Sequence, residues 1–260
     1  MSERDYFMSP ATYDAVYGDF KADVPHVLDL LRRPGGPALE ACCGNGRLLL
    51  PALREGFAVD GLDLDPAMLD DLRDKLAAAS LATNLHQADM RDFSLPGRYA
   101  LIVIAFNSFL HNLSQEDQLA TLRCCRLHLE PEGRLALVTF HPSAEKLIEF
   151  SSGERLVADR PLEGGRIRVF DRADDDRVEQ TRRVTRRIER LGADGGVASE
   201  ETFRFRLRYV YKPEMELLLR VAGFSRWEMR PLFASYTDPA SDATGRPVRE
   251  GDNLLWTAWA

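Results

Sequence analysis

The sequence lacks a long apolar run and an excess of basic residues. Hydrophobic residues make up 45% of its 260 positions, and no apolar stretch approaches the roughly 18 residues that a membrane-spanning helix needs. The charged start, Met1 to Asp5, is followed by no apolar segment, so we expect neither a secretory signal nor an anchor. The formal net charge is −7, and an acidic surface repels phosphate backbones. We therefore expect a soluble, cytoplasmic protein that binds neither nucleic acid nor a membrane.

Cysteine and histidine are also scarce, and their spacing argues against a disulfide and against a metal site. The four cysteines form two adjacent pairs, Cys42-Cys43 and Cys124-Cys125. Neighbouring cysteines have neither the C-x₂-C spacing of a zinc site nor that of an ordinary disulfide. The histidines have no carboxylate at a convincing metal-binding spacing. We expect reduced, buried thiols and no metal ion.

Neither an internal repeat nor a low-complexity segment interrupts the chain, and its length fits one large domain or one domain with an insertion. From residue 37 to about 140, short apolar runs alternate with longer amphipathic stretches, the pattern of βαβ units in an α/β fold with a parallel sheet. The predicted strands are 38–42, 58–62, 85–88, 101–106 and 135–140, and the predicted helices between them are 47–55, 66–79 and 115–129.

The pattern changes after residue 140. From about 156 to 211, apolar and polar residues alternate with period two, and glycine- and aspartate-rich turns break the alternation. The clearest strand, 203–211, places aromatic and leucine side chains on one face and Arg204, Arg206 and Arg208 on the other. We expect residues 153–211 to form an inserted antiparallel β subdomain. Residues 1–152 and 212–260 would then form the α/β domain, with a helix at 213–222 and strands at 227–233 and 253–260.

The most informative segment begins at Leu39 and ends at Arg47, where a strand runs into a tight glycine turn and then a helix. Gly44 and Gly46 let the backbone pass close to a ligand, and free N–H groups at the helix start can bind a carboxylate. Glu40, near the strand end, can hold an amine or a hydroxyl, so the segment suits an amino-acid moiety. A dinucleotide-binding fingerprint needs a third glycine where Leu49 stands, which disfavours a nicotinamide-dependent dehydrogenase.

Two further acidic residues follow the next two predicted strands. Asp63 stands where a carboxylate can accept hydrogen bonds from both hydroxyls of a ribose. Asp89 can accept from an adenine amino group while Met90 packs on the ring. Each residue alone has ordinary structural explanations, such as a turn or a solvated charge. Their succession at three strand ends indicates a nucleoside site.

Here the sequence resembles the class I S-adenosylmethionine-dependent methyltransferases. Residues 40–46 are similar to the family's Glu-x-Gly-x-Gly-x-Gly motif, 61–69 to its ribose motif, 88–90 to its adenine motif and 129–135 to the turn before its fifth strand. The chain departs from the family at Cys42, where glycine is usual, and at Ala100, where an aspartate is common. The resemblance implies a Rossmann-like, seven-stranded, mostly parallel sheet with flanking helices, with S-adenosylmethionine as methyl donor and S-adenosylhomocysteine as product. The implied cofactor-binding residues are Tyr13, Glu40, Cys42, Gly44, Gly46, Asp63, Leu64, Asp89, Met90 and Phe106.

The insertion is similar in position to that of glycine and amino-sugar N-methyltransferases, which cover the active site with a small antiparallel sheet. This similarity implies a small-molecule acceptor methylated on nitrogen, with oxygen as the next choice. In the family, tyrosines of the segment before the first strand can reach the cofactor or the acceptor, and Tyr13 and Tyr17 match them.

Catalysis is expected just beyond strands four and five, because ligands of open α/β sheets lie beyond the carboxyl ends of the strands. Methyl transfer is an in-line displacement, so the protein mainly aligns the acceptor and excludes water. We predict His111 as a base and Asn107 as an orienting amide. Predicted substrate contacts are Tyr17, His141, Arg206 and Tyr209, where an inward-facing arginine would favour a carboxylate or phosphate.

Two further alternatives stay open from the residues alone. A methyltransferase of nucleic acid or protein is disfavoured, because Phe106-Asn107-Ser108-Phe109 replaces the Asn-Pro-Pro-Tyr type of motif. A protein that binds S-adenosylmethionine without turnover, or for other chemistry, fits the same cofactor motifs. Exposed strand edges in the insertion also allow a homodimer.

Overall fold

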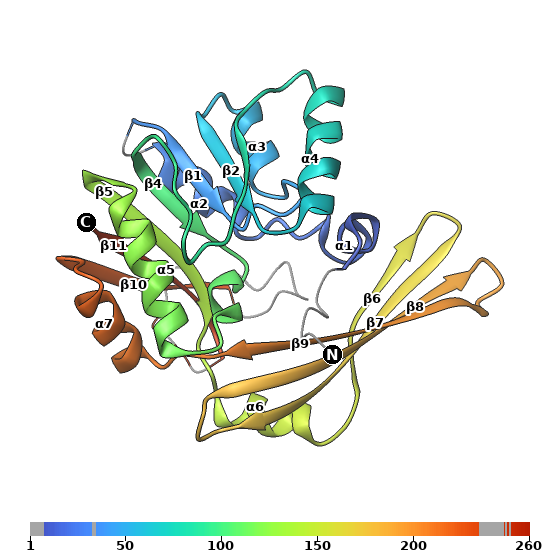
Figure 1. Cartoon of the computed structure of the whole chain (residues 1–260). Coiled ribbons are helices and arrows are strands. Elements are labelled where there is room, and N and C mark those ends of the chain that lie inside the picture. Colours follow the sequence, from blue (N-terminus) through green and yellow to red (C-terminus); the bar gives the residue numbers. More distant parts are fainter. Residues whose placement is uncertain (1–7, 33–34, 234–246, 248, 250) are drawn as a thin grey trace.

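The computed structural model describes residues 8–32, 35–233, 247, 249 and 251–260 (Figure 1). A seven-stranded sheet forms its centre, in the order β10-β11-β5-β4-β1-β2-β3. The strands β1 to β5 run parallel, and β11 runs antiparallel to both β5 and β10. Their bounds are β1 Ala38–Ala41, β2 Val59–Asp63, β3 Leu85–Gln87, β4 Tyr99–Ile104, β5 Leu129–Phe140, β10 Arg226–Phe233 and β11 Asn253–Trp259.

Local sequence signals set the limits of the helices that flank this sheet. The Asp65 side chain accepts a hydrogen bond from Ala67 N at the start of α4, and Pro66 fits the first turn. The Ser114 hydroxyl accepts from Asp117 N at the start of α5. The helices are α1 Pro10–Tyr17, α2 Val24–Arg32, α3 Leu49–Arg54, α4 Pro66–Ala78, the 3₁₀ helix η1 Ser108–His111, α5 Gln115–Leu127, α6 Ala144–Ser151 and α7 Lys212–Val221.

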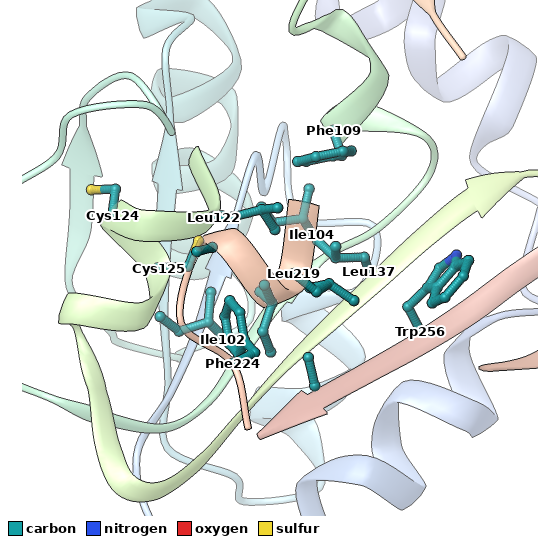
Figure 2. Packing of buried hydrophobic residues seen from close by; sticks show 14 of the residues in the cluster. Ile102, Ile104, Phe109, Leu122, Cys124, Cys125, Leu137, Leu219, Phe224 and Trp256 are labelled. Carbon is teal, nitrogen blue, oxygen red and sulfur yellow. The ribbon is translucent and has the colours of Figure 1, made fainter. Parts of the chain in front are cut away.

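Apolar side chains cover both faces of the central sheet. On one face, β4 and β5 pack against α5 and α7 through residues such as Ile102, Leu122 and Leu219 (Figure 2). On the other, α2, α3 and α4 bury Leu28, Leu49 and other leucines against β1 and β4. Because both faces are covered, the strands are apolar almost throughout, as parallel strands usually are. Because packing fills both faces, a ligand is expected at the carboxyl ends of the strands.

A second, four-stranded antiparallel sheet lies beside the end of the first (Figure 1). It consists of β6 Arg155–Leu162, β7 Gly165–Asp176, β8 Thr181–Gly192 and β9 Val197–Arg208. The expectation of a mostly parallel seven-stranded sheet with an antiparallel insertion is confirmed. In the described part of the chain, no helix is both long and apolar enough to span a membrane.

The last strand of the insertion begins and ends earlier than predicted. It ends at Arg208, and the predicted row of arginines on one face stops at Arg206, because Arg208 is buried. Its guanidinium donates to Gln118 Oε1 (2.8 Å) and Glu214 Oε1 (2.7 Å). A buried guanidinium needs such partners. Arg208 therefore fastens the insertion to α5 and α7 and is unavailable for a substrate.

Candidate functional site

A cavity of about 510 Å³ opens at the carboxyl ends of β1 to β4. Its volume lies within the range of small-molecule sites, and its position is where open α/β sheets bind ligands. The predicted residues that line it are Tyr13, Glu40, Cys42, Gly44, Asp63, Leu64, Asp89, Met90, Phe106 and His111. Additional lining residues, which the sequence motifs did not single out, include Met8, Arg47, Met68, Arg91, Ser108, Asn112 and Asp117.

The glycine turn after β1 has the backbone conformation that its motif requires. Cys42, Gly44 and Gly46 all have positive φ, at 64°, 52° and 90°. Cys42 thus adopts the left-handed conformation in which the resembled motif has glycine. Its thiol lies 3.6 Å from the sulfur of Met90. The departure from glycine changes the side chain at the cavity wall and leaves the turn intact.

The two glycines of the turn have different surroundings. A Cβ atom on Gly44 would meet nothing within 4 Å, and Gly44 lines the cavity. A Cβ atom on Gly46 would lie 2.4 Å from Cδ1 of Leu72 on α4. Gly46 does not line the cavity, so the structure assigns it to packing of α4 and not to the predicted cofactor contact. Gly44 keeps the approach to the cavity open.

Asp63 ties the end of β2 to the glycine turn. One carboxylate oxygen accepts from Gly44 N (2.7 Å) and the other from Asp65 N (2.9 Å). Burial raises the pKa of Asp63, and these backbone donors oppose that rise. Each oxygen keeps a further lone pair. Asp63 can accept hydrogen bonds from a ligand and at the same time shape the turn.

A buried ion pair forms the floor beside this turn. Arg47 Nη1 and Nη2 donate to the two carboxylate oxygens of Asp23 at 2.6 and 2.7 Å, and the two side chains are 8% and 0% exposed. The guanidinium carbon lies 4.5 Å from the centre of the Phe106 ring. Arg47 Nε is buried and has no hydrogen-bond partner. The sequence motifs did not predict this ion pair, although Arg47 directly follows the glycine turn.

Glu40 lies close enough to Arg47 to be affected by its charge. Burial raises the pKa of Glu40 to about 8, and the Arg47 guanidinium opposes the rise. A carboxyl group with this pKa exchanges a proton near neutral pH. A cation bound beside it would favour the ionised form.

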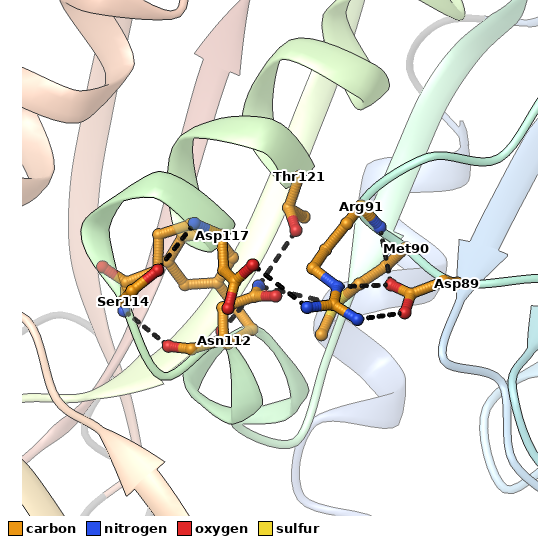
Figure 3. Close-up of polar contacts among 9 residues, drawn as sticks. Asp89, Met90, Arg91, Asn112, Ser114, Asp117 and Thr121 are labelled. Atoms are coloured by element: carbon orange, nitrogen blue, oxygen red, sulfur yellow. Dashed lines mark hydrogen bonds and ion pairs between the residues drawn. The ribbon is translucent and has the colours of Figure 1, made fainter.

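At the opposite end of the cavity, Arg91 joins two carboxylates (Figure 3). Its guanidinium donates to both oxygens of Asp89 (3.0 and 2.7 Å) and to Asp117 Oδ1 (3.0 Å). The bond to Arg91 lowers the pKa of Asp89. The predicted adenine acceptor is therefore already bound within the protein. Asn112, which donates to Thr121 Oγ1 (3.0 Å), lies beside Met90.

His111 and Phe106 line the side of the cavity nearest the inserted sheet. Burial lowers the pKa of His111 to about 4, so its imidazole is neutral at pH 7. Its ring centre is 6.1 Å from that of Phe205 on β9. A neutral imidazole with so low a pKa is a weak proton acceptor and a competent hydrogen-bond acceptor. Desolvation therefore makes His111 a weaker base than an ordinary histidine.

The other predicted substrate or catalytic residues do not line the cavity. Asn107 Oδ1 accepts from Phe140 N (2.7 Å) and so holds the end of β5. The Tyr17 hydroxyl accepts from Arg186, and Tyr209 is fully buried. Strand register places Arg206 on the face of the inserted sheet opposite to Arg186. His141 packs against Tyr211, with ring centres 6.3 Å apart.

Among the residues that the structure describes, no cluster of three histidine, cysteine or acidic side chains is arranged to hold a metal ion. All four cysteines are free thiols. Cys124 and Cys125 lie in the core between the sheet and α5 (Figure 2).

Comparisons with known proteins agree with this geometry. A family model described as a methyltransferase domain matches residues 38–133. A dTDP-3-amino-3,4,6-trideoxy-alpha-D-glucopyranose N,N-dimethyltransferase from Streptomyces venezuelae is 33% identical over 128 residues, which are 46% of this chain and 52% of that protein. A dTDP-3-amino-3,6-dideoxy-alpha-D-glucopyranose N,N-dimethyltransferase from Streptomyces fradiae is 33% identical over 129 residues, 46% and 49% of the two chains. The chain thus matches about half the length of these curated relatives.

Solved structures match over the whole chain. The CcbJ methyltransferase from Streptomyces caelestis has a TM-score of 0.73 at 24% identity and covers 100% of both chains. DesVI from Streptomyces venezuelae has a TM-score of 0.75 at 21% identity and covers 98% of this chain and 100% of its own. These likenesses establish the fold.

The fold is that of the class I S-adenosylmethionine-dependent methyltransferases. Residues 38–133, which hold the glycine turn, Asp63 and Asp89, are the part of the chain that matches the methyltransferase-domain model. The cofactor of this class is S-adenosylmethionine, which is bound in the structure of the amino pentose methyltransferase CalS10 from Micromonospora echinaspora (TM-score 0.73, 22% identity, 100% of both chains).

The two glycines of the turn are predicted to respond differently to alanine. Gly46→Ala combines positive φ with overpacking against Leu72 and should lower the free energy of unfolding by about 2–4 kcal/mol. Gly44→Ala has only the backbone cost, about 1 kcal/mol, and should instead weaken ligand binding. Urea unfolding and ligand titration of both variants check this. Equal losses of stability would contradict the assignment.

Glu40→Gln is predicted to change how stability depends on pH. An unfolded glutamate ionises near pH 4.5, whereas the folded pKa is about 8, so the native state binds the additional proton between these values. Wild-type stability from this group therefore falls as pH rises through that interval, and the glutamine variant does not share the fall. Urea unfolding at about pH 5.5 and about pH 8 should show the variant gaining relative to wild type at the higher pH. Glu179→Gln, at an exposed turn, is the control, and a pH-independent difference would contradict the expectation.

Proposed function

We propose that this chain transfers a methyl group from S-adenosylmethionine to the amino nitrogen of a small molecule, with a nucleotide-linked amino sugar as the first acceptor class to test. The observation that carries the proposal is the cavity itself. Its carboxylates lie at three successive strand ends, and a glycine turn and apolar side chains line the same cavity. The names of the two curated relatives, both amino-sugar N,N-dimethyltransferases, support the acceptor class. Oxygen is the alternative acceptor atom.

The residues around the cavity fit the chemical groups of S-adenosylmethionine. The open face of Gly44 suits a carboxylate, while Glu40 suits an ammonium. Asp63 suits the ribose hydroxyls. The apolar side chains that suit an adenine ring are Leu64, Met68 and Met90.

When bound, S-adenosylmethionine supplies a methyl group on a positively charged sulfur. The acceptor needs a free lone pair on nitrogen, so its amine must be unprotonated. Neutral His111 can accept a hydrogen bond from that amine and turn its lone pair toward the methyl carbon. Transfer of the methyl group to this nitrogen would leave the electron pair of the broken C–S bond on sulfur. The new ammonium then gives its additional proton to water, because His111 is too weak a base to retain it.

The surroundings of His111 indicate how water would be kept out. Phe106 and Tyr13 line the same side of the cavity, with ring centres 6.3 Å apart. Phe205 reaches over His111 from the inserted sheet. Aromatic walls of this kind bind the apolar face of a sugar or a base and exclude water. Residues 153–211 thus form, in this proposal, the substrate-side subdomain, and residues 1–152 and 212–260 the methyltransferase domain.

The proposal places the enzyme in the cytoplasm, where four free thiols remain reduced. It also includes a homodimer formed through the inserted sheet, since β6 and β9 are the edges of that sheet. Size-exclusion chromatography with light scattering tests the oligomeric state.

Methylation of an amine is the direct test. The protein is incubated with S-adenosylmethionine and a dTDP-3-amino-3,6-dideoxyhexose, and the sugar is followed by mass spectrometry. We expect one and then two methyl additions, with one S-adenosylhomocysteine formed for each. His111→Ala should lower kcat by about 10- to 100-fold and leave the cofactor Kd within about twofold.

His86→Ala, on the edge strand β3, is the matched control and should retain activity. A protein that binds S-adenosylmethionine tightly but methylates no amine or hydroxyl in a broad acceptor panel would contradict the proposed reaction and support a binding role instead.

A further inference from the structure

Helix α1 is attached to the inserted sheet through buried contacts. Thr12 Oγ1 accepts from Arg190 Nη2 (2.7 Å), and the Tyr17 hydroxyl accepts from Arg186. Arg186 is itself held by both carboxylate oxygens of Asp171 (2.8 and 2.7 Å). Between these polar contacts, Val16 packs in an apolar cluster that is completed by Met8, Tyr17, Ile167, Val169 and Ile188. These contacts make α1 and the inserted sheet one packed unit.

The opposite side of α1 is attached to the methyltransferase domain through Asp14. One oxygen of Asp14 accepts from Asn45 Nδ2 (2.9 Å) and the other from Lys75 Nζ of α4 (2.6 Å). Both Asn45 Nδ2 and Lys75 Nζ also contact Asp71 (3.0 and 2.8 Å). The Asp14 side chain is 43% exposed. This attachment is polar and solvent-accessible and therefore weaker than the buried one. Tyr13 and Tyr17 also contact the ring of Phe106 (ring centres 6.3 and 4.9 Å apart), which lies outside the glycine turn.

Asp14 is linked to the cavity through two residues, Asn45 and Tyr13. Asn45 stands between Gly44 and Gly46, so its amide belongs to the glycine turn. The amide nitrogen has two acceptors, whereas the amide oxygen is buried without a partner. Tyr13, which precedes Asp14, lines the cavity. Helix α1 lies between α4 and the inserted sheet in Figure 1. Asp14 thus connects α1 to the glycine turn.

We propose that Asp14 is a positioning residue that controls release of the cofactor: α1 and the inserted sheet separate from the glycine turn when Asp14 loses Asn45 and Lys75. The inference rests on the proposed function, because it concerns the same cavity. The buried side of α1 stays attached to the sheet during this movement, since its ion pair and apolar cluster are costlier to expose. Asp14 acts through Asn45 and Tyr13 and does not itself line the cavity.

Surface plasmon resonance with S-adenosylhomocysteine over immobilised full-length protein tests the inference. Asp14→Ala should raise the dissociation rate constant by about three- to tenfold, because the closed arrangement loses its exposed attachment. Asp70→Ala is the matched control. It also removes one negative charge, but Asp70 is 72% exposed on α4 and pairs with Arg73 of the same helix. Its dissociation rate should stay within about twofold of wild type.

Lys75→Gln provides a second route to the same result if Asp14→Ala proves unstable. It should raise the dissociation rate in the same direction, and combining it with Asp14→Ala should add less than the sum of the two effects. Added salt should speed dissociation from wild type more than from Asp14→Ala, because it screens the exposed ion pair.

The outcomes separate the inference from the proposed function. Normal S-adenosylhomocysteine binding with unchanged dissociation rates in Asp14→Ala and Lys75→Gln would overturn the role of Asp14 and leave the proposed function standing. A lowered melting temperature of the unliganded Asp14→Ala protein with an unchanged dissociation rate would likewise show a merely structural residue. Wild-type protein that fails to bind S-adenosylhomocysteine would instead overturn the proposed function.

Discussion

The cavity depends on the buried ion pair of Arg47 and Asp23. Moving two charges out of water carries a large desolvation cost, which only close, fully hydrogen-bonded contact offsets. Both nitrogens at the end of the guanidinium are used on Asp23, and Arg47 Nη1 also contacts Phe20 O (3.2 Å). The pair therefore fixes the start of α2 against the glycine turn. Its geometry leaves Nε as a buried donor at the cavity wall.

The electrostatics of the cavity follow from this pair. Asp23 neutralises most of the charge of Arg47, so Glu40 receives too little positive potential to overcome its own burial, and its pKa remains raised. The same guanidinium lies on the face of Phe106, whose ring contacts Tyr13 and Tyr17. Arg47 thus lies between the acidic residues on the proposed cofactor side of the cavity and the aromatic residues on the proposed acceptor side. A cation bound beside Glu40 would stabilise its ionised form and lower its pKa.

The sequence predicted features that depend on local patterns. Apolar runs with period-two or helical spacing located most of the predicted strands and helices within a few residues, because burial of those side chains decides where elements form. The start of β5 at Leu129 and the helices α1, α2 and α6 were not predicted. Asp63 and Gly44 were found because they follow strands whose carboxyl ends must meet at one edge of the sheet. Cys42 was singled out as a departure from glycine, and it has the backbone conformation that glycine would have.

Contacts between distant segments were not predictable in the same way. The Arg47–Asp23 pair and the Asp14–Asn45 contact join residues 24 and 31 positions apart, with no motif to link them. Strand alternation placed Arg208 on one face with Arg204 and Arg206, but at the end of β9 its side chain lies in the junction with α5 and α7. Asn107 follows the correct strand, yet it holds Phe140 N because the chain bends there at positive φ. In each case, packing between distant segments determined where the side chain lies.

Isothermal titration calorimetry of the wild-type protein and Asp63→Ala with S-adenosylmethionine and S-adenosylhomocysteine is the decisive test of cofactor binding in this cavity. We predict one site per chain for wild type, a stabilisation of about 3 kcal/mol at a hundredfold excess over Kd, and loss of both in Asp63→Ala. Absence of binding heat and of stabilisation with either ligand for the folded wild-type protein would contradict this prediction.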